Sequence, residues 1–273
     1  MNRCEIHIGT QGWNYEDWVG GFYPRGTRAA DFLDLYVKVF DTVEIDASFY
    51  AIPSEAAIQS WYKRAPQNFT YSLKLPQEIT HHNRLQDSED LLLRFCERVR
   101  DLQEKLALIL IQLPPDFSPR SLPALEKFLP LLPTDVRFAI EFRDRHWVLE
   151  DIGELVLELL RENRVALALA DSKWLPRETM IQLAAQPTAD FAYVRWLGPA
   201  ELTNYSRIQI NRDVEFALWQ EVFGKLQQNV SEVYGYFNNH YQGHSPGSAN
   251  HFKQLLGQPV VAPSVLEDQP SLF

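Results

Sequence analysis

The sequence predicts an α/β fold, a single (β/α)8 barrel of the TIM type, and three observations lead to it. Eight short segments rich in β-branched, aromatic and leucine residues are each followed by a segment with helical periodicity. The predicted connections from helix to strand are short, and those from strand to helix are long. No Gly-x-Gly-x-x-Gly turn follows any strand, which weakens the dinucleotide-binding form of the alternative, an open doubly wound sheet.

The predicted elements alternate along the chain. The strands are Glu5–Gly9, Thr42–Ala47, Thr70–Leu75, Ala107–Leu113, Arg137–Phe142, Val165–Ala170, Phe191–Trp196 and Glu232–Phe237. The helices that follow them are Ala29–Val39, Glu55–Ala65, Glu89–Leu106, Leu122–Leu132, Ile152–Glu162, Arg177–Ala185, Val214–Gln228 and Gly247–Leu256. Ser54 and Ser88 precede the second and third helices, where a serine side chain can cap the first turn.

Five strand-to-helix segments are long. They are Thr10–Arg28, Pro76–Asp87, Arg143–Asp151, Leu197–Asp213 and Asn238–Pro246. In a catalytic barrel the long loops follow the carboxyl ends of the strands and carry the active site. The loop lengths therefore predict a functional site at that mouth of the barrel.

Composition narrows the class of protein. The chain has 273 residues, 45% of them hydrophobic, and a net charge of -10, which argues against a broad nucleic-acid surface. Two cysteines exclude a disulfide framework and a cysteine-built zinc site. We see no signal peptide and no apolar stretch of membrane-spanning length, and we expect a cytoplasmic protein. We assign residues 1–257 to the barrel and 258–273 to an acidic, proline-containing tail.

Charged side chains alternate with apolar ones on several strands, so one face of each strand points into the barrel. This parity predicts four catalytic carboxylates: Glu44, Asp46, Glu141 and, just past the sixth strand, Asp171. It predicts five ligand-binding residues beside them: Lys74, Gln112, Arg143, Arg195 and Asn238. The alternative is a salt-bridge network of Glu44, Lys74, Glu141 and Arg195 that fills the barrel, since buried charges need partners.

Two chemistries fit these groups. Paired carboxylates act as general acid and base when their environments separate their pKa values. Carboxylates with a histidine instead hold a divalent metal that activates water. The loops contain His81, His82, His240 and His244, but no His-Glu-x-x-His pattern. The sequence therefore names no metal ligands, and a divalent cofactor stays an open alternative.

Aromatic and small residues gather at the same mouth. Trp13, Tyr50 and Trp147 lie after strands, where aromatic faces can stack on sugars or bases. The eighth loop adds Asn239, His244 and Gly247 before the last helix, whose N-terminus, with Arg195, predicts an anion site. The ligand expected here is small and anionic or sugar-like.

Several longer motifs carry a family resemblance. They are IGTQGWNYEDWVGGFYP, FDTVEIDASFYAIPS, FTYSLKLPQEITHHNRL, LILIQLPPDF, RFAIEFRDRHW, FAYVRWLG and VYGYFNNHYQGHSPGSA. Together they resemble the YecE-like family, known as domain of unknown function 72. The resemblance implies a single TIM-type barrel and supplies no reaction. Gln11 stands where the family commonly has Ser, and Asp46 where it commonly has Asn.

The last residues supply a separate motif. Gln269-Pro270-Ser271-Leu272-Phe273 resembles the Gln-x-x-Leu-Phe peptide by which bacterial replication and repair proteins dock on the sliding clamp. Leu272 and Phe273 would fill an apolar pocket and Gln269 would hydrogen-bond at its rim. Two hypotheses follow. The first is a hydrolase or isomerase acting on a phosphorylated sugar, nucleotide or nucleic-acid fragment. The second is a non-enzymatic binding module tethered to the clamp.

Overall fold

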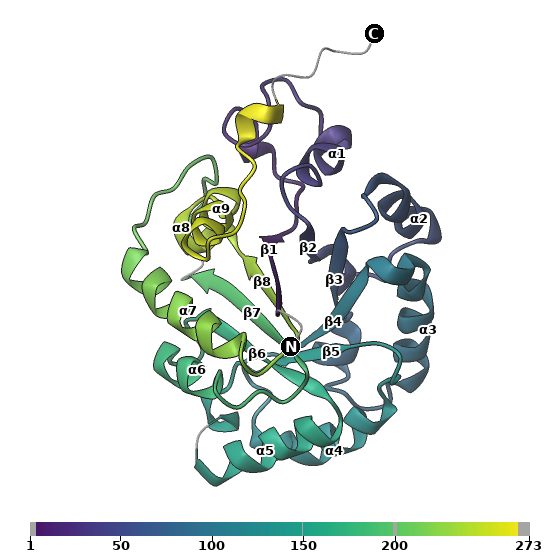
Figure 1. Ribbon diagram of the computed structural model, residues 1–273. Coiled ribbons are helices and arrows are strands. Elements are labelled where there is room, and N and C mark those ends of the chain that lie inside the picture. The colour runs from purple at the N-terminus through teal and green to yellow at the C-terminus, as the bar shows by residue number, and fades with distance from the viewer. Residues whose placement is uncertain (1–3, 149, 199–200, 267–273) are drawn as a thin grey trace.

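A computed structural model of the protein describes residues 4–148, 150–198 and 201–266. Within these ranges the strands form one closed parallel barrel in sequence order, from β1 to β8 (Figure 1). The strands are β1 Glu5–Gln11, β2 Thr42–Ile45, β3 Thr70–Lys74, β4 Leu106–Gln112, β5 Phe138–Glu141, β6 Val165–Ser172, β7 Phe191–Gly198 and β8 Glu232–Phe237. The predicted TIM-type barrel is confirmed.

Pairing of the first strand with the last closes the barrel. Along β1 and β8 the register runs from Glu5 opposite Glu232 to Thr10 opposite Phe237. Inside the barrel, small and aromatic side chains pack as a separate buried cluster that includes Ala139, Tyr193 and Tyr236. This cluster fills the middle of the barrel. The inward polar residues near the carboxyl ends of the strands therefore lie above it, close to the mouth.

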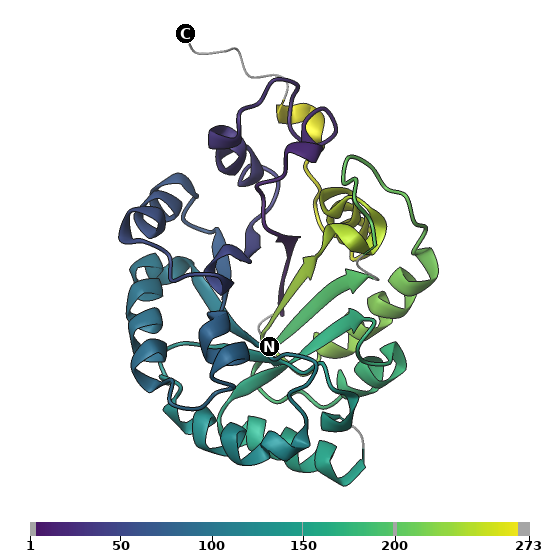
Figure 2. The same ribbon diagram turned by 180° about the vertical axis from the view of Figure 1, so that it is seen from behind.

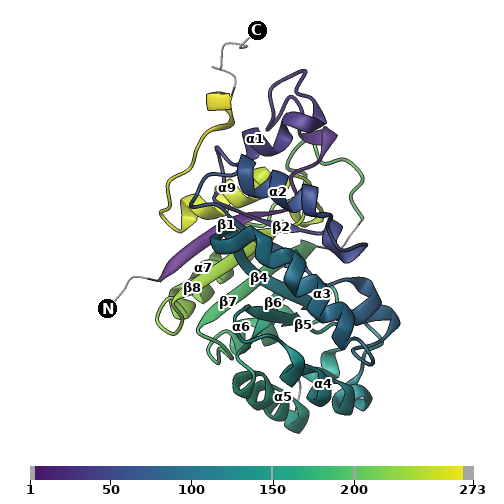
Figure 3. The same cartoon turned by 90° about the vertical axis from the view of Figure 1, so that its right-hand side faces the viewer.

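Helices surround the strands (Figures 1 and 2). They are α1 Phe32–Tyr36, α2 Glu55–Arg64, α3 Glu89–Val99, α4 Leu122–Phe128, α5 Glu150–Glu162, α6 Arg177–Leu183, α7 Asp213–Leu226, α8 Asn239–Gln242 and α9 Ser245–Leu255. Figure 3 shows α2, α3 and α4 covering the outside of the barrel. Their apolar sides meet the outward residues of the strands in the main hydrophobic core.

Several helices are shorter than the sequence predicts, and in three of them part of the predicted segment is a 3-10 helix: α1, α3 and α4, which ends at Phe128 instead of Leu132. The segment predicted as Ala29–Val39 divides into a 3-10 turn, Ala29–Asp31, and α1. The segment predicted as Glu89–Leu106 ends its α-helical part at Val99 and continues as a 3-10 helix, Arg100–Lys105. There Gln103 has a φ of 52°, in the left-handed region, so the α-helix cannot run on to β4.

The two predicted serine caps have different outcomes. Ser54 caps α2, because its Oγ accepts a hydrogen bond from the Ala57 N–H at 3.2 Å. Ser88 stands at the N-cap position of α3 without capping it. Its Oγ donates instead to the Gln86 carbonyl at 2.7 Å, so that prediction is wrong.

The segment after α9 stays in contact with the barrel. Gln258 donates from Nε2 to the Ile6 carbonyl at 2.7 Å, and Leu266, at the end of the 3-10 turn Pro263–Leu266, belongs to the hydrophobic core. The predicted clamp-docking residues Gln269, Leu272 and Phe273 lie outside the described residues. In the part of the chain that is described, no helix is both long and apolar enough to cross a membrane.

Candidate functional site

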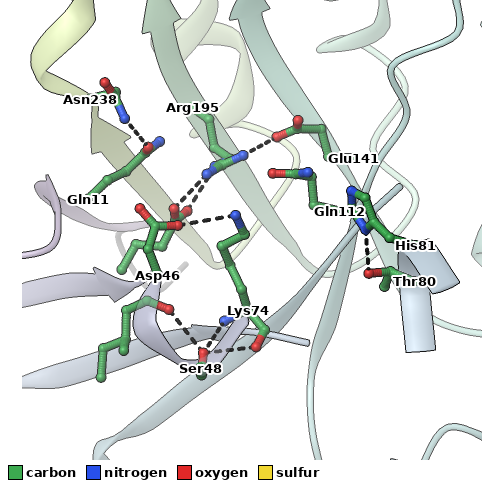
Figure 4. Close-up of polar contacts among 12 residues, drawn as sticks. Gln11, Asp46, Ser48, Lys74, Thr80, His81, Gln112, Glu141, Arg195 and Asn238 are labelled. Carbon is green, nitrogen blue, oxygen red and sulfur yellow. Dashed lines mark hydrogen bonds and ion pairs between the residues drawn. The ribbon is translucent and has the colours of Figure 1, made fainter. Parts of the chain in front are cut away.

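A buried ionic layer lies across the upper barrel and consists of Glu44 on β2, Glu141 on β5 and Arg195 on β7. Arg195 binds Glu44 with two parallel hydrogen bonds, Nε to Oε2 at 2.9 Å and Nη2 to Oε1 at 2.7 Å. Its Nη1 donates to Glu141 Oε2 (Figure 4). Tyr193 donates its hydroxyl to Glu44 Oε2 at 2.5 Å. All three charged side chains are at most 2% exposed.

The charges of this layer shift one another's pKa values. Burial alone would raise the pKa of Glu141, but Arg195 and Arg143 outweigh it and hold the pKa at about 2. Burial raises the pKa of Glu44 against the lowering effect of Arg195. Burial would lower the pKa of Arg195, yet Glu141 and Glu44 raise it well above its ordinary value. The guanidinium therefore stays charged.

A second set of polar groups lies above the ionic layer. Arg143 donates from Nε to Glu141 Oε1 at 2.7 Å and from Nη2 to Gln112 Oε1 at 2.8 Å. Lys74 Nζ lies 3.2 Å from Asp46 Oδ1 and 4.4 Å from the centre of the Phe49 ring. The lysine and the aspartate thus form a pair at the edge of the opening, with the aspartate side chain 35% exposed.

Ser48 holds the strand ends that carry this pair together. Its Oγ donates to the carbonyls of Ile45 and Lys74 and accepts from the Lys74 N–H at 3.0 Å. The serine lies in a 3-10 turn, Ala47–Phe49, directly after β2. The turn therefore ties β2 to β3 at the point where Asp46 and Lys74 meet (Figure 4).

A cavity of about 540 Å³ opens above these groups. It is lined by Gln11, Tyr15, Asp46, Phe49, Tyr50, Lys74, Gln77, His81, Gln112, Arg143, Arg195, Leu197 and Asn238. These residues come from the carboxyl ends of seven strands, all except β6, and from the loops that follow them. This is the mouth at which TIM barrels carry their active sites.

Gln11 has an unused hydrogen-bond donor at the cavity wall. Asn238 donates from Nδ2 to Gln11 Oε1 at 2.8 Å, which fixes the orientation of the glutamine amide. The Gln11 side-chain nitrogen is buried and has no partner among the described residues. Figure 4 shows this nitrogen turned away from Asn238. An amide N–H in such a place needs an acceptor.

His81 is an uncharged side chain at the same cavity. It belongs to a π-helical turn, Glu78–His82, after β3, and its Nδ1 lies 2.8 Å from Thr80 Oγ1. Burial lowers its pKa, and the charges of Arg143 and Lys74 lower it further, to about 4. The imidazole is therefore neutral at pH 7.

Seven of the residues predicted from strand parity, loop position or aromatic character lie together at the cavity. Asp46, Tyr50, Lys74, Gln112, Arg143, Arg195 and Asn238 all line the cavity. Glu44 and Glu141 lie beneath it in the ionic layer. Gln11, Gln77 and His81 line it as well, although the sequence does not single them out as site residues.

Asp171 is not part of this cavity. It lies within β6 rather than past its end, and its Oδ2 accepts from Arg177 Nε on α6, Trp219 Nε1 on α7 and the Tyr241 hydroxyl on α8. The carboxylate therefore faces outward and joins β6 to three helices. Its observed contacts are structural.

Five further predicted ligand residues lie away from the cavity. Trp147 is 0% exposed, stacks on Phe117 and Phe142, and donates from Nε1 to the Phe117 carbonyl. Trp13 packs edge-on against Trp61. Asn239 Oδ1 accepts from Trp18 Nε1 and from Ser245, His244 bonds the Tyr205 carbonyl, and Gly247 lines a separate groove.

The predicted anion site therefore divides. Arg195 lies in the ionic layer and Gly247 in the groove at the start of α9. That groove holds about 270 Å³ and is lined by Ile208, Gln209, Ile210, Asn211, Asp213, Gln242, Gly247 and His251. Arg195 is not among them. Arg195 and Gly247, which the prediction places in one anion site, therefore lie in two separate places.

A metal centre finds little support in the residues present. Among the described residues, no group of three or more His, Cys, Asp or Glu side chains is arranged to hold an ion. Glu44 and Glu141, the carboxylates that would serve as ligands, are already bound by Arg195. The Arg195 guanidinium lies between these two carboxylates, where the metal hypothesis would place the ion.

Comparison with known proteins identifies the family. The model of the family described as protein of unknown function DUF72 matches residues 7–271. This chain belongs to that family. It is 24% identical to the UPF0759 protein YecE of Escherichia coli (strain K12), over 83% of this chain and 84% of that protein. It is 25% identical to the UPF0759 protein YunF of Bacillus subtilis (strain 168), over 92% and 94%.

Solved structures agree with the barrel. A DUF72 family protein from Thermotoga maritima superposes with a TM-score of 0.79 at 26% identity, covering 93% of this chain and all of that one. D-psicose 3-epimerase from Clostridium cellulolyticum H10, solved with D-tagatose, superposes with a TM-score of 0.51 at 14% identity over 96% and 97%. The second likeness, to a sugar epimerase, shows the TIM-barrel fold alone.

Proposed function

We propose that this DUF72 barrel is an isomerase-type enzyme that binds a sugar-like, polyhydroxylated substrate in the mouth cavity. The observation that carries the proposal is the unpartnered side-chain nitrogen of Gln11 at the cavity wall. Leaving a buried donor without an acceptor is unfavourable by roughly 1–3 kcal/mol. A substrate oxygen at this position removes that penalty.

The rest of the lining suits hydroxyl groups. Gln11, Gln77, Gln112 and Asn238 contribute four side-chain amides, whose N–H groups can donate to the oxygen atoms of a sugar. Phe49 and Tyr50 add aromatic surface for the apolar face of a sugar ring. A small number of precisely placed polar groups beside aromatic side chains is typical of small-molecule sites.

The arrangement of carboxylates favours proton transfer over glycoside hydrolysis. Hydrolysis of a glycosidic bond by the common mechanism needs two carboxyl groups that face the sugar. Glu44 and Glu141 do not line the cavity, and among the described residues that do, Asp46 alone presents a carboxylate. Asp46 can take a proton next to a substrate carbonyl, while Lys74, 3.2 Å away, stabilises negative charge that develops on oxygen.

The test follows proton exchange in heavy water. Aldoses and ketoses are incubated with the protein in D2O, and NMR follows deuterium incorporation next to the carbonyl. We expect exchange with one class of sugar, slowed by roughly 10²–10⁴-fold in Asp46→Asn. We expect Gln11→Leu to weaken binding of that sugar by about tenfold, the effect of one hydrogen bond.

Matched controls separate these effects from misfolding. Gln59→Leu changes an exposed glutamine on α2 and should leave sugar binding and exchange unchanged. Thermal unfolding of every variant checks the fold. The proposal is rejected if no sugar binds the unaltered protein, or if Asp46→Asn exchanges deuterium at the original rate.

A further inference from the structure

We infer that the cavity wall formed by β3, β4 and β5 is a subsite for an oxyanion on the substrate, and that His81 takes up a proton when this group binds. The oxyanion is a carboxylate or a phosphate-type group. The inference rests on the proposed function, because it assigns a second feature to the same substrate. The charges and contacts of Lys74, His81 and Arg143 support it.

The cavity presents more positive than negative charge. Among the described residues that line it, Lys74, Arg143 and Arg195 are cationic and Asp46 is anionic. The balancing carboxylates Glu44 and Glu141 lie below, almost fully buried. A ligand in the cavity therefore meets the cations directly, whereas two of the three anions are shielded from it.

The cations of this wall keep donors for a ligand. Arg143 binds Glu141 through Nε and Gln112 through Nη2, which leaves Nη1 for an oxyanion. The Lys74 ammonium has three N–H groups and forms one ion pair, with Asp46, within the described part of the chain. Gln112 is on β4, the strand between β3 and β5, and can donate from its amide nitrogen. Arginine and lysine together are the usual partners of carboxylate and phosphate groups.

His81 completes the same wall. Its charged and titratable neighbours are Lys74 from β3, Arg143 after β5, His82 beside it and Asp116 in the loop after β4. Phe49 packs edge-on against its ring, with centroids 4.9 Å apart. Cations outnumber anions around the imidazole, which disfavours its protonation. An oxyanion bound at this wall adds negative charge next to the ring and favours its protonation.

Charge neutrality explains why a proton should follow the anion. With His81 uncharged, the three cations of the mouth balance Asp46, Glu44 and Glu141. Adding an oxyanion leaves excess negative charge in a partly buried site. Protonation of His81 restores the balance and adds an N–H donor for the anion.

The experiment uses sulfate and acetate, whose charges are constant between pH 6 and pH 8. Each is titrated into the protein by calorimetry, in two buffers with different ionisation enthalpies, to count protons taken up. We expect proton uptake that increases as the pH falls from 8 to 6 and approaches one proton per bound anion at the acidic end, with an affinity that rises by up to tenfold per pH unit there. Sulfate preference indicates a phosphate-type group, and acetate preference a carboxylate.

Variants of two adjacent histidines assign the proton. His81→Gln should abolish proton uptake while the anion still binds through Lys74 and Arg143. His82→Gln removes a histidine that pairs with Glu78 in the same turn, and it should retain the uptake. Proton uptake that persists in His81→Gln overturns the assignment to this residue.

The outcomes also separate this inference from the proposed function. Sugar binding with no binding of either anion overturns the subsite and leaves the sugar proposal standing. Anion binding with proton uptake, but no sugar binding under any condition, supports the subsite and overturns the sugar proposal.

Discussion

At the scale of single residues, Arg195 determines what the carboxylates of the mouth can do. Its three nitrogen atoms bind Glu44 and Glu141, and Tyr193 binds Glu44 as well. Glu141, whose pKa is lowered to about 2, is a poor base, and both carboxylates already bind a guanidinium, which makes them poor metal ligands. The arrangement favours the alternative in which they form a structural network, and it leaves Asp46 as the carboxylate available for chemistry.

Replacing Glu141 with glutamine tests this division of roles. Glu141→Gln keeps the shape but removes a charge that Arg195 and Arg143 share. Because it leaves buried positive charge without its partner, we expect a loss of roughly 3–5 kcal/mol in the free energy of unfolding. Urea unfolding measures it, and Glu126→Gln on the exposed side of α4 is the control. Unchanged stability in Glu141→Gln would contradict the structural role.

The ion pair between Glu141 and Arg195 also makes the stability of the protein depend on pH in the acidic range. Glu141 has a pKa of about 2 in the folded protein, below the roughly 4.3 of a free glutamate. A lowered carboxyl pKa means that the stabilisation is complete above about pH 4.3 and is lost as the pH falls toward 2. Urea midpoints between pH 5 and pH 2.5 should therefore fall less steeply in Glu141→Gln than in the unaltered protein.

Residue parity explains both successes and failures of prediction. On β2 and β5 charged and apolar residues alternate, so the inward direction of Glu44 and Glu141 follows from the sequence. On β6 the run VALALA is apolar throughout, so no charged residue within it marks the inward face. Large and small residues do alternate there: Leu167 and Leu169 pack in the outer core, and Asp171 shares their parity and faces the helices. Gln11 is neutral and lies two residues beyond the predicted end of β1, so no charge marks it.

At the scale of elements, strands follow the predictions more closely than loops do. The strand predictions agree because apolar patterns extend over several residues. Loop structure depends on tertiary contacts that the sequence does not display. The 3-10 turn Arg145–Trp147 buries Trp147, and the π-helical turn Glu78–His82 brings His81 to the cavity. Neither turn has a sequence signal that we can identify.

One glycine tests how tightly two strands approach. A Cβ added to Gly9 on β1 would lie 2.2 Å from the Thr42 carbonyl oxygen on β2. Since backbone cannot move aside easily, we expect Gly9→Ala to lower the free energy of unfolding by roughly 1–3 kcal/mol. Gly224 on α7 has open space around its Cβ position, so Gly224→Ala should raise it by about 0.5–1 kcal/mol. Equal effects in the two variants, measured by urea unfolding, would contradict this account.

At the scale of the whole molecule, the closed barrel brings residues distant in sequence into one site. Gln11 meets Asn238 because β1 pairs with β8, and Glu44 meets Arg195 across the interior. The fold class predicts that such residues converge, since all strand ends of a parallel barrel share one mouth. It does not predict which of them bind each other, because that depends on the length and rotamer of each side chain.

The final peptide predicts a partner for the whole molecule. If Gln269, Leu272 and Phe273 dock on a bacterial sliding clamp, the full chain should bind immobilised clamp, and removal of residues 269–273 should abolish binding. Leu272→Ala with Phe273→Ala should have nearly the same effect, because the apolar pair supplies most of the buried surface in such a peptide. A variant with the five residues in scrambled order is the matched control. Clamp binding that survives the deletion would place the interaction elsewhere, and no binding by the full chain would remove the clamp hypothesis.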